Sequence, residues 1–376
     1  MTDLIEKAKR IVIKVGSSLI VNQGAGSLRE EWLRTLAGDV ANLRSRGKEV
    51  VIVTSGSVAL GRKYITSAKR SLKLEEKQAA AACGQPELVR HYQKFLGKEN
   101  IPVAQILLTI LDSETRRNYL NAKNTIETLL ANGVVPVINE NDTVATEELR
   151  FGDNDRLAAR VAQMVGADLL ILFSDVDGLY TDNPRLEPDA KHIHEVREIT
   201  KQIEDMASGA LSDGVGSGGM ITKIEAAKIA VSGGCIMILA SGKENNPVKS
   251  LESNGRHTVF FSHENPNSAR KRWIAHSLNV QGVIIIDDGA LKALKSGKSL
   301  LPAGVIDVTG KFDRGDPVVI KDSRQNKIGV GISAYASDDA RLIMGQKSEE
   351  IENMVGFSGR NELIHRDNLV LVGTKE

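Results

Sequence analysis

The stretch IVIKVGSS, residues 11–18, decides the fold of this chain. Residues 11–15 are nearly all aliphatic and lack the polar alternation of a strand with one face in water, which is typical of a parallel strand buried on both faces. A Gly-Ser-Ser turn follows at once. Comparable aliphatic runs recur along the chain, at residues 50–53, 103–108, 134–138, 169–173 and, as a sixth candidate, 235–240.

Helix-like segments separate these runs, at residues 29–46, 75–96, 119–132 and 155–165. Strands that alternate with helices predict right-handed βαβ crossovers and a mostly parallel sheet covered on both faces. The predicted fold is therefore α/β, a three-layer αβα sandwich. Ligands bind beyond the carboxyl ends of the strands in such sheets, so the polar motifs directly after the aliphatic runs are candidates for a site.

The pattern changes after about residue 241, where a polar, turn-rich segment begins. Short β-like pieces separated by Gly- and Asp-containing turns then follow, at residues 283–286, 304–308, 317–320, 328–332 and 369–372. This pattern predicts a small, mainly β second domain. We place the first domain at residues 1–262, a linker at 263–276 and the second domain at 277–376.

Composition excludes several classes of protein. Of 376 residues 41% are hydrophobic and 26% charged, and the net charge of +1 gives no overall attraction to nucleic acid or to an anionic membrane. No apolar stretch has the length of a signal peptide or a membrane span. Cys83 and Cys235 lie far apart, which fits a reduced, intracellular protein better than a disulfide scaffold. We expect a cytoplasmic location and no membrane partner.

Two motifs directly follow the first two strands. Lys14 leads into the turn of residues 16–18, where its ammonium and backbone N–H groups can face one phosphate. Ser55 follows the second strand and offers both an N–H and a hydroxyl to a ligand. Taken alone, each also fits a structural role, as an exposed lysine at a strand end and as a helix cap.

Acidic and amide groups gather after the fourth strand, in NEND at residues 139–142 and in GDND at residues 152–155. Burying so many of them is costly unless they pair with an ammonium group, a lysine or a metal. Asp142, Asn154 and Asp155 are therefore candidates for a site. The alternative is a pair of solvated turns, since Asp and Asn are common helix caps.

Two later segments suit a nucleotide. Ser174 and Asp175 follow the fifth strand and open the loop SDVDGLYTDNP, which lacks the closing Glu of a calcium loop. The segment GSGGMITK, residues 216–223, is a glycine-rich turn with Thr and Lys at the start of a predicted helix, and such a turn can hold a phosphate. A flexible linker is the alternative for this segment.

Two further patterns carry no function. His365-Arg366-Asp367 copies the catalytic triplet of protein kinases, but it lies near the C-terminus without a D-F-G downstream. His192 and His194 have the spacing of metal ligands but lack partners. No metal-ligating residue is predicted.

Together the motifs IKVGSS, VTSGSVALG, NENDTVAT, GDND, SDVDGLYTDNP and GSGGMITK resemble the amino acid kinase family. The last two are similar across several members and indicate the phosphoryl donor, whereas NEND paired with GDND is similar to the members that phosphorylate glutamate. Residues 289–316, GALKALKSGKSLLPAGVIDVTGKFDRGD, resemble the start of a PUA domain. The resemblance covers residues 8–372 and is weakest around 241–270.

The resemblance implies roles for particular residues. Lys14 and Lys223 would contact the phosphates and the transferring group, and Asp155 would orient both lysines. The residues implied to bind glutamate are Ser55, Asp142 and Asn154. Those implied to bind ATP are Lys14, Ser174, Asp175, Ser217, Gly218, Gly219, Met220, Ile221, Thr222 and Lys223.

The resemblance also implies cofactors and partners. ATP would be the co-substrate, with Mg²⁺ held mainly by phosphate oxygens and water. The resemblance further implies a place in proline biosynthesis, feedback inhibition by proline and a homo-oligomer. It also implies transient contact with glutamate-5-semialdehyde dehydrogenase, which would take over the labile acyl phosphate.

The implied chemistry suits these residues. The acceptor carboxylate, with a pKa of about 4.3, is ionised at neutral pH and needs no general base. The obstacle is repulsion between this anion and the triphosphate, roughly 4 kcal/mol per charge pair at about 4 Å and an effective dielectric constant of about 20. Two lysines, glycine-turn N–H groups and Mg²⁺ meet that obstacle.

Two rival functions stay open at this point. One is a sister kinase that phosphorylates acetylglutamate, aspartate, carbamate or a nucleoside monophosphate. The other is RNA binding through the second domain, since PUA folds elsewhere often contact RNA. Residues 263–376 hold 16 Lys and Arg against 15 Asp and Glu, which lacks the basic footprint of a nucleic-acid-binding domain, so we do not expect a nucleic-acid partner.

Overall fold

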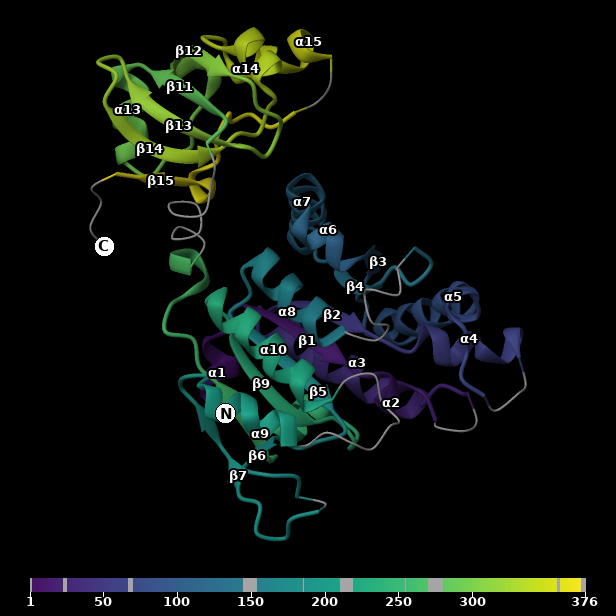
Figure 1. Cartoon of the computed structure of the whole chain (residues 1–376). Coiled ribbons are helices and arrows are strands. Elements are labelled where there is room, and N and C mark those ends of the chain that lie inside the picture. Colours follow the sequence, from purple (N-terminus) through teal and green to yellow (C-terminus); the bar gives the residue numbers. More distant parts are fainter. Residues whose placement is uncertain are drawn as a thin grey trace. The chain divides into compact units, whose positions relative to one another are not determined.

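The structure is a computed structural model that describes residues 2–22, 26–66, 70–144, 154–184, 186–209, 219–253, 255–269, 280–356 and 359–372. The chain divides into two compact units, Met1–Pro266 and Asn267–Glu376. The exact limits given above for the two domains and the linker stay predictions. Figure 1 labels most of the helices and strands of both units.

An eight-stranded sheet forms the centre of the first unit, in the order β3-β4-β2-β1-β5-β9-β10-β8. The six predicted strands form within one or two residues of their expected limits, as β1 (Arg10–Val15), β2 (Glu49–Thr54), β3 (Val103–Leu108), β4 (Val135–Glu140), β5 (Leu169–Ser174) and β9 (Ile236–Ser241). Neighbouring members of these six pair in parallel, as expected.

The far edge of the sheet contains strands that the aliphatic pattern did not indicate. Strand β10 (His257–Phe260) pairs antiparallel with β9, and β8 (Glu195–Val196) pairs with β10. A separate hairpin joins β6 (Leu179–Tyr180) to β7 (His192–Ile193). Strand β10 lies just after the polar, turn-rich residues 241–255, and its four residues were too few to stand out.

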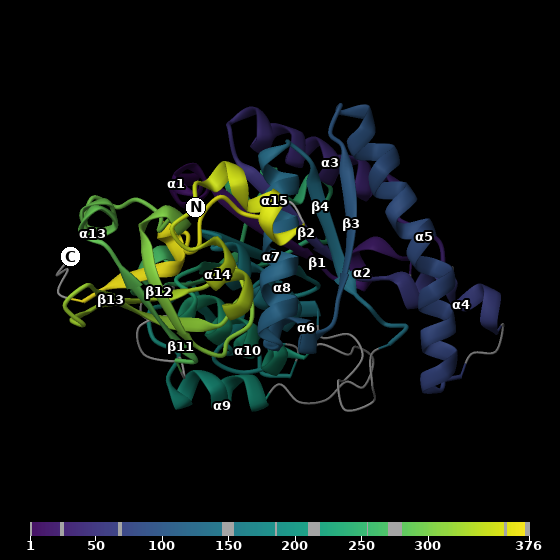
Figure 2. The ribbon, with the colours of Figure 1, turned by 90° about the horizontal axis from the view of Figure 1, so that it is seen from above.

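Helices cover both faces of the sheet, as predicted for a three-layer sandwich. One face carries α3 (Glu30–Ser45), α5 (Leu74–Lys98) and α11 (Pro247–Glu252), and the other carries α7 (Arg116–Ala131), α8 (Asn154–Val165) and α10 (Met220–Ser232). Figure 2 shows α3 and α5 on one side of the central strands and α8 and α10 on the other. The remaining helices are α1 (Thr2–Lys7), α2 (Ser17–Ile20), α4 (Ser57–Ile65), α6 (Ile110–Glu114) and α9 (Lys201–Gly209).

The alternation of side chains along β1 sends Lys14 to a particular face. Ile11, Ile13 and Val15 pack in the core shared with α3 and α5, whereas Val12 packs in the core shared with α8 and α10. Because side chains two residues apart lie on the same face of a strand, Lys14 lies on the Val12 face. The alternation of side chains along β1 therefore directs the Lys14 ammonium group toward α8 and α10.

Helices α4 and α5 cross at two glycines. A Cβ atom on Gly84 would lie 1.9 Å from the backbone oxygen of Ser57, and one on Gly61 would lie 1.8 Å from the backbone oxygen of Ala80. No side chain fits there, so the two helix backbones touch. This crossing places the middle of α5 beside the start of α4.

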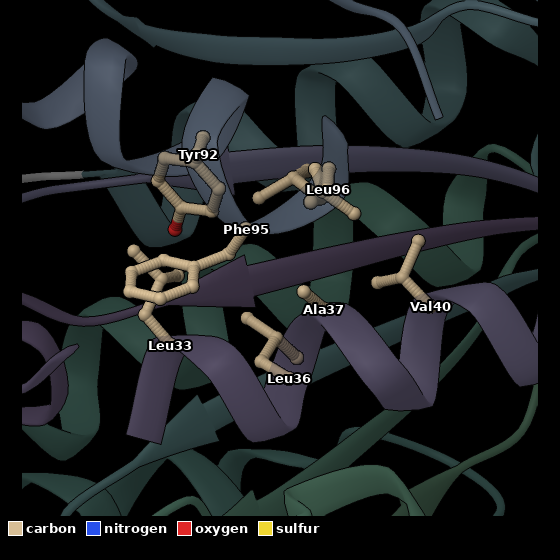
Figure 3. A pocket seen from close by; sticks show the side chains of 8 residues that line it. Leu33, Leu36, Ala37, Val40, Tyr92, Phe95 and Leu96 are labelled. Atoms are coloured by element: carbon tan, nitrogen blue, oxygen red, sulfur yellow. The ribbon is translucent and has the colours of Figure 1, made fainter. Parts of the chain in front are cut away.

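An apolar gap lies between α3 and α5, above β2 (Figure 3). The space between its side chains is too small to hold a water molecule. It is lined by Leu33, Leu36, Ala37, Val40, Ile52, Tyr92, Phe95 and Leu96. The gap is a loosely packed part of the core and offers no polar group for chemistry.

The second unit has its own sheet and its own core. Its strands are β11 (Gly282–Ile286), β12 (Val305–Gly310), β13 (Pro317–Asp322), β14 (Lys327–Ile332) and β15 (Leu369–Leu371), in the order β12-β11-β13-β14-β15. Helices α13 (Asp288–Lys295), α14 (Ser337–Ile343) and α15 (Ile351–Val355) accompany them. The mainly β character expected from the sequence is confirmed. Among the described residues of the whole chain, none of the helices is both long enough and apolar enough to cross a membrane.

Candidate active site

One carboxylate, that of Asp155, lies between two ammonium groups. Asp155 is in the first turn of α8, Lys14 is in β1, and Lys223 is in the first turn of α10. Lys14 Nζ forms an ion pair with Oδ1 of Asp155, and Lys223 Nζ lies 3.2 Å from Oδ2. The exposed fractions are 7% for Lys14, 2% for Asp155 and 4% for Lys223, so the cluster is buried and weakly screened by solvent.

The two ammonium groups keep Asp155 ionised. Burial by itself raises the pKa of Asp155, but the charges of Lys14 and Lys223 outweigh it and hold the pKa well below its ordinary value. The Thr222 hydroxyl oxygen lies 3.2 Å from Oδ2. The formal charges of the two lysines and the aspartate sum to +1, so the cluster suits an anion.

Asn154, the residue before Asp155, joins the ends of β2 and β4. Its Nδ2 lies 3.1 Å from the backbone oxygen of Thr54, 2.7 Å from Oγ of Ser55 and 3.0 Å from Oδ1 of Asn139. Its Oδ1 is buried and has no hydrogen-bond partner among the residues that the structure describes. Buried amide oxygens are nearly always paired, so this oxygen is available to a donor that the chain does not supply.

Asp142 follows β4 and is buried. Its Oδ2 accepts a hydrogen bond of 2.9 Å from Oγ of Ser57. Burial raises the pKa of Asp142, and the hydrogen bond from Ser57 only partly offsets this effect. Within the described ranges no lysine or arginine forms an ion pair with it. A buried carboxylate of this kind is stabilised by a ligand with a positive charge.

The strand order separates two groups of site residues. Ser55 and Asn139 belong to the ends of β2 and β4, Ser174 belongs to the end of β5, and β1 with Lys14 lies between β2 and β5. The N–H of Ser55 donates to the backbone oxygen of Val15 over 3.2 Å. The sheet therefore sets Lys14 between a region on the β2–β4 side and a region on the β5 side.

Helix α10 packs against α8 and against β9, the neighbour of β5 in the sheet. Gly219 is its extended N-cap, and Thr222 Oγ1 donates to the backbone oxygen of Gly219 over 2.9 Å. Met220 and Ile221 pack against the apolar core beneath. The first backbone N–H groups of a helix have no partners within it and carry the positive end of its dipole, so they can bind an anion.

The remaining predicted nucleotide residues divide into two sets. Ser174 is buried at the end of β5, and its hydroxyl donates to Oδ1 of the exposed Asp175 over 3.1 Å. Ser217 and Gly218 lie outside the described residues, as do Gly152 and Asp153 of the GDND motif.

Sequence reasoning missed the residues that link these groups. Asn139 lies in the motif NEND and Ser57 lies in the motif VTSGSVALG, but neither residue was assigned a role from the sequence. Gln85 of α5 was not considered, although its Oε1 accepts a hydrogen bond of 2.7 Å from Nδ2 of Asn139. Its signal in the sequence was a polar residue within the buried face of a long helix.

The two patterns set aside earlier have structural contacts. Nδ1 of His365 accepts from the backbone N–H of Asp367 over 3.2 Å at the start of a short 3₁₀ turn. His192 packs edge-on against His194 and Tyr180. Across the described part of the chain, no group of three or more His, Cys, Asp or Glu side chains could hold a metal ion.

Comparison with known families gives two matches. Residues 9–241 match the amino acid kinase family, and residues 282–355 match the PUA domain. The two matches correspond to the eight-stranded and five-stranded units.

Comparison with known proteins finds relatives along nearly the whole chain. A glutamate 5-kinase from Paramagnetospirillum magneticum is 55% identical over 366 residues, which cover 97% of this chain and 98% of the relative. A glutamate 5-kinase from Nitrobacter hamburgensis is 54% identical over 376 residues, which cover 100% of this chain and 99% of the relative. A glutamate 5-kinase from Ruegeria sp. is 51% identical over 367 residues, which cover 98% of this chain and 99% of the relative.

Proposed function

We infer how the site works from the premise that this chain belongs to the amino acid kinase family and, within it, to the glutamate 5-kinases. It therefore uses ATP to phosphorylate the side-chain carboxylate of L-glutamate, giving L-glutamyl 5-phosphate in proline biosynthesis. Its second unit belongs to the PUA domains. The proposals below concern which residues perform this reaction and how.

Glutamate binds, in this proposal, on the β2–β4 side of the site. Asp142 is a buried carboxylate without a cation, and Asn154 Oδ1 is a buried acceptor without a donor in the described chain. The α-ammonium of glutamate supplies the charge and the N–H donors that both groups need. Ser55 Oγ lies 2.7 Å from the donor Nδ2 of Asn154, so its hydroxyl hydrogen can donate to a substrate carboxylate. The single observation that carries this assignment is that Asp142 is buried and, among the described residues, has a hydrogen bond from Ser57 but no ion pair with a lysine or arginine.

ATP binds, in this proposal, on the β5 side. Ser174 ends β5, Asp175 follows it, and the first turn of α10 presents backbone N–H groups and Lys223. The segment from Ser217 to Lys223 then surrounds the phosphates, with the helix dipole favouring their negative charge.

The transferring phosphoryl group passes between these two regions, beside Lys14 and Lys223. The acceptor carboxylate is already ionised at neutral pH, so no residue has to remove a proton. What the chain contributes is alignment of two anions and positive charge around the group in flight. Asp155 holds each lysine by one carboxylate oxygen and so fixes both ammonium groups relative to each other.

Mg²⁺ accompanies ATP in this proposal. Asp155 is engaged by two lysines and, in this proposal, Asp142 is engaged by the α-ammonium of glutamate, so these two residues fit an ion held mainly by phosphate oxygens and water. When bound, the ion would neutralise part of the phosphate charge.

The wider roles are also proposals. Free Cys83, exposed on α5, favours a reducing compartment such as the cytoplasm. Edge strand β3, beside exposed Leu107 and Leu111, offers an unpaired sheet edge that supports a homo-oligomer. Family membership supports proline as a feedback inhibitor. The reactivity of an acyl phosphate supports its transfer to glutamate-5-semialdehyde dehydrogenase.

A panel of acceptors tests the substrate assignment. The purified chain is incubated with ATP and with glutamate, acetylglutamate, aspartate, carbamate or a nucleoside monophosphate, and product is read as trapped hydroxamate and as ATP consumed. Glutamate is expected to give the highest kcat/KM, with hydroxamate formed in step with ATP loss. A higher kcat/KM with another acceptor would overturn the assignment.

A further inference from the structure

Gln85 is a buried polar residue of the site region that the proposed function does not use. It lies in α5, is 8% exposed, and its Oε1 accepts from Nδ2 of Asn139 over 2.7 Å. Its Nε2 is buried and has no hydrogen-bond partner in the described part of the chain. A buried amide with one unpaired end is costly to keep, so a structural role alone accounts poorly for it.

The close helix crossing explains how Gln85 reaches the site. Gly84, the residue before it, leaves no room for a side chain against the backbone oxygen of Ser57. The contact brings α5 against the start of α4, where Ser57 donates to Asp142. A residue from an outer helix thereby enters the polar cluster at the ends of β2 and β4.

The amide groups of this cluster form a directed chain. The backbone oxygen of Thr54 can only accept, so it fixes Nδ2 of Asn154 toward itself. Asn139 must then turn its oxygen toward Asn154 and its Nδ2 away, toward Gln85. Gln85 ends the chain by accepting from Nδ2 of Asn139 over 2.7 Å, which is shorter than the 3.3 Å from the same nitrogen to Oγ of Ser57.

We propose that Gln85 is a positioning residue for glutamate: it holds the Asn139 amide in the one orientation that leaves Oδ1 of Asn154 facing the substrate ammonium. This inference rests on the proposed placement of glutamate at Asp142 and Asn154. Gln85 acts through Asn139 and Asn154 and touches neither ATP nor the reacting atoms. Its loss should therefore weaken recognition of the ammonium group and leave recognition of the two carboxylates alone.

Two ligands separate these effects. Glutamate carries the ammonium, whereas glutarate carries the same two carboxylates without it and serves as a competitive inhibitor. In Gln85→Met, which keeps the side-chain length but has no acceptor oxygen, the KM for glutamate should rise about tenfold, the loss expected for one hydrogen bond to a charged group. The Ki of glutarate, kcat and the KM for ATP should each change by less than about twofold, because uniform substrate binding alone is affected.

Two control variants make the result specific. Gln93→Met lies on the exposed side of the same helix and should leave every constant unchanged. Gln85→Glu keeps an oxygen where Asn139 Nδ2 needs one, so its KM for glutamate should lie below that of Gln85→Met. If the KM of Gln85→Glu for glutamate equals or exceeds that of Gln85→Met, the proposed role of Gln85 is wrong. It is also wrong if Gln85→Met weakens the binding of glutarate and of glutamate equally.

Failure of the underlying site is distinguishable from failure of this inference. Asp142→Ala and Asn154→Ala are measured beside the Gln85 variants. If both leave the KM for glutamate unchanged, the proposed glutamate site is wrong. If they raise it and Gln85→Met does not, the site stands and the role of Gln85 is wrong. If thermal unfolding shows that Gln85→Met does not fold, Gln85→Glu is compared with the native chain instead. Because Gln85→Glu keeps an acceptor for Asn139, its preference for glutamate over glutarate should match that of the native chain. A preference lower than native by more than about threefold would count against the proposed role of Gln85.

Discussion

The ammonium group of Lys223 lies 3.2 Å from Oδ2 of Asp155, a residue 68 positions earlier in the chain. The other oxygen of the same carboxylate pairs with Lys14 of β1. Three elements, β1, α8 and α10, thus meet at one buried carboxylate. This arrangement fixes two cations beside the space where, in our proposal, the phosphoryl group passes from ATP to glutamate.

Replacing either lysine should stop turnover without unfolding the chain. We expect Lys14→Ala and Lys223→Ala to lower kcat by about 10²–10³-fold, the loss typical of removing one group that stabilises transition-state charge. Steady-state ATP consumption measures kcat, and circular dichroism checks the fold. Lys228→Ala is the matched control, because Lys228 is exposed on the same helix and pairs only at the surface with Glu204. Near-native turnover in Lys14→Ala or Lys223→Ala would remove that lysine from the mechanism.

Removing the charge of Asp155 should destabilise the fold. Asp155→Asn keeps the side-chain shape but leaves two buried ammonium groups without their shared carboxylate, and loss of one partner from a buried ion pair costs about 3–5 kcal/mol. Denaturant unfolding at neutral pH measures the change in unfolding free energy. A change within experimental error would show that the cluster is not a source of stability.

The same variant also isolates a pH dependence. The folded-state pKa of Asp155 is lowered, so the unfolded state binds the proton more readily, and the carboxylate stabilises the fold above its unfolded pKa. This contribution is lost as the pH falls through the ordinary aspartate range toward the folded pKa. The difference in stability between the native chain and Asp155→Asn should therefore shrink on acidification. A difference that stays constant from neutral pH to acid would contradict the lowered pKa.

Asp142 should set the acid limit of glutamate binding. Its pKa is raised by burial, so in the free enzyme the carboxylate takes up a proton at a higher pH than an exposed aspartate does. Because only the ionised form attracts an ammonium group, kcat/KM for glutamate should fall on acidification before the acceptor carboxylate itself titrates. In Asp142→Asn the KM for glutamate should be high at all pH values. The fall of kcat/KM on acidification should also occur at a lower pH than in the native chain. A fall at an unshifted pH in this variant would exclude Asp142 as its origin.

The crossing of α4 and α5 should tolerate no side chain. Gly84→Ala would place a Cβ 1.9 Å from the backbone oxygen of Ser57, and we expect a loss of at least about 1–3 kcal/mol of unfolding free energy with a raised KM for glutamate. Gly97→Ala, near the end of the same helix, meets no atom within 4 Å and should be neutral or stabilising by up to about 1 kcal/mol. Equal stability of the two variants in thermal unfolding would show that the crossing relaxes freely.

The first unit should catalyse without the second. All the described site residues lie within Met1–Pro266, which has two apolar cores of its own. A chain lacking residues 267–376 should fold and keep glutamate-dependent ATP consumption within roughly tenfold of the full chain, less than the loss of one catalytic group. A folded product without activity would show that the PUA domain takes part in catalysis.

Local patterns in the sequence were enough to predict most elements of the fold. The aliphatic runs indicated six parallel strands because a strand buried on both faces excludes polar residues wherever it lies in the sheet. Strand β10 was missed because it has only four residues, and its pairing with β9 and β8 exists only in the folded sheet. The short hairpin of β6 and β7 depends in the same way on contacts distant in sequence.

For the site, the sequence determined which chemical groups are present, and the order of motifs along the strands placed them at one edge of a sheet. Only the tertiary structure decided which groups touch. The alternation of side chains along β1 places Lys14 on the face that α8 covers. Asp155 in the first turn of α8 pairs with Lys14 there and also with Lys223 in the first turn of α10. Gln85 could not be assigned from the sequence, because its role arises from a helix crossing at two glycines that no local pattern encodes. Propensity and periodicity act over a few residues, whereas hydrogen bonds between distant residues depend on the packing of the whole unit.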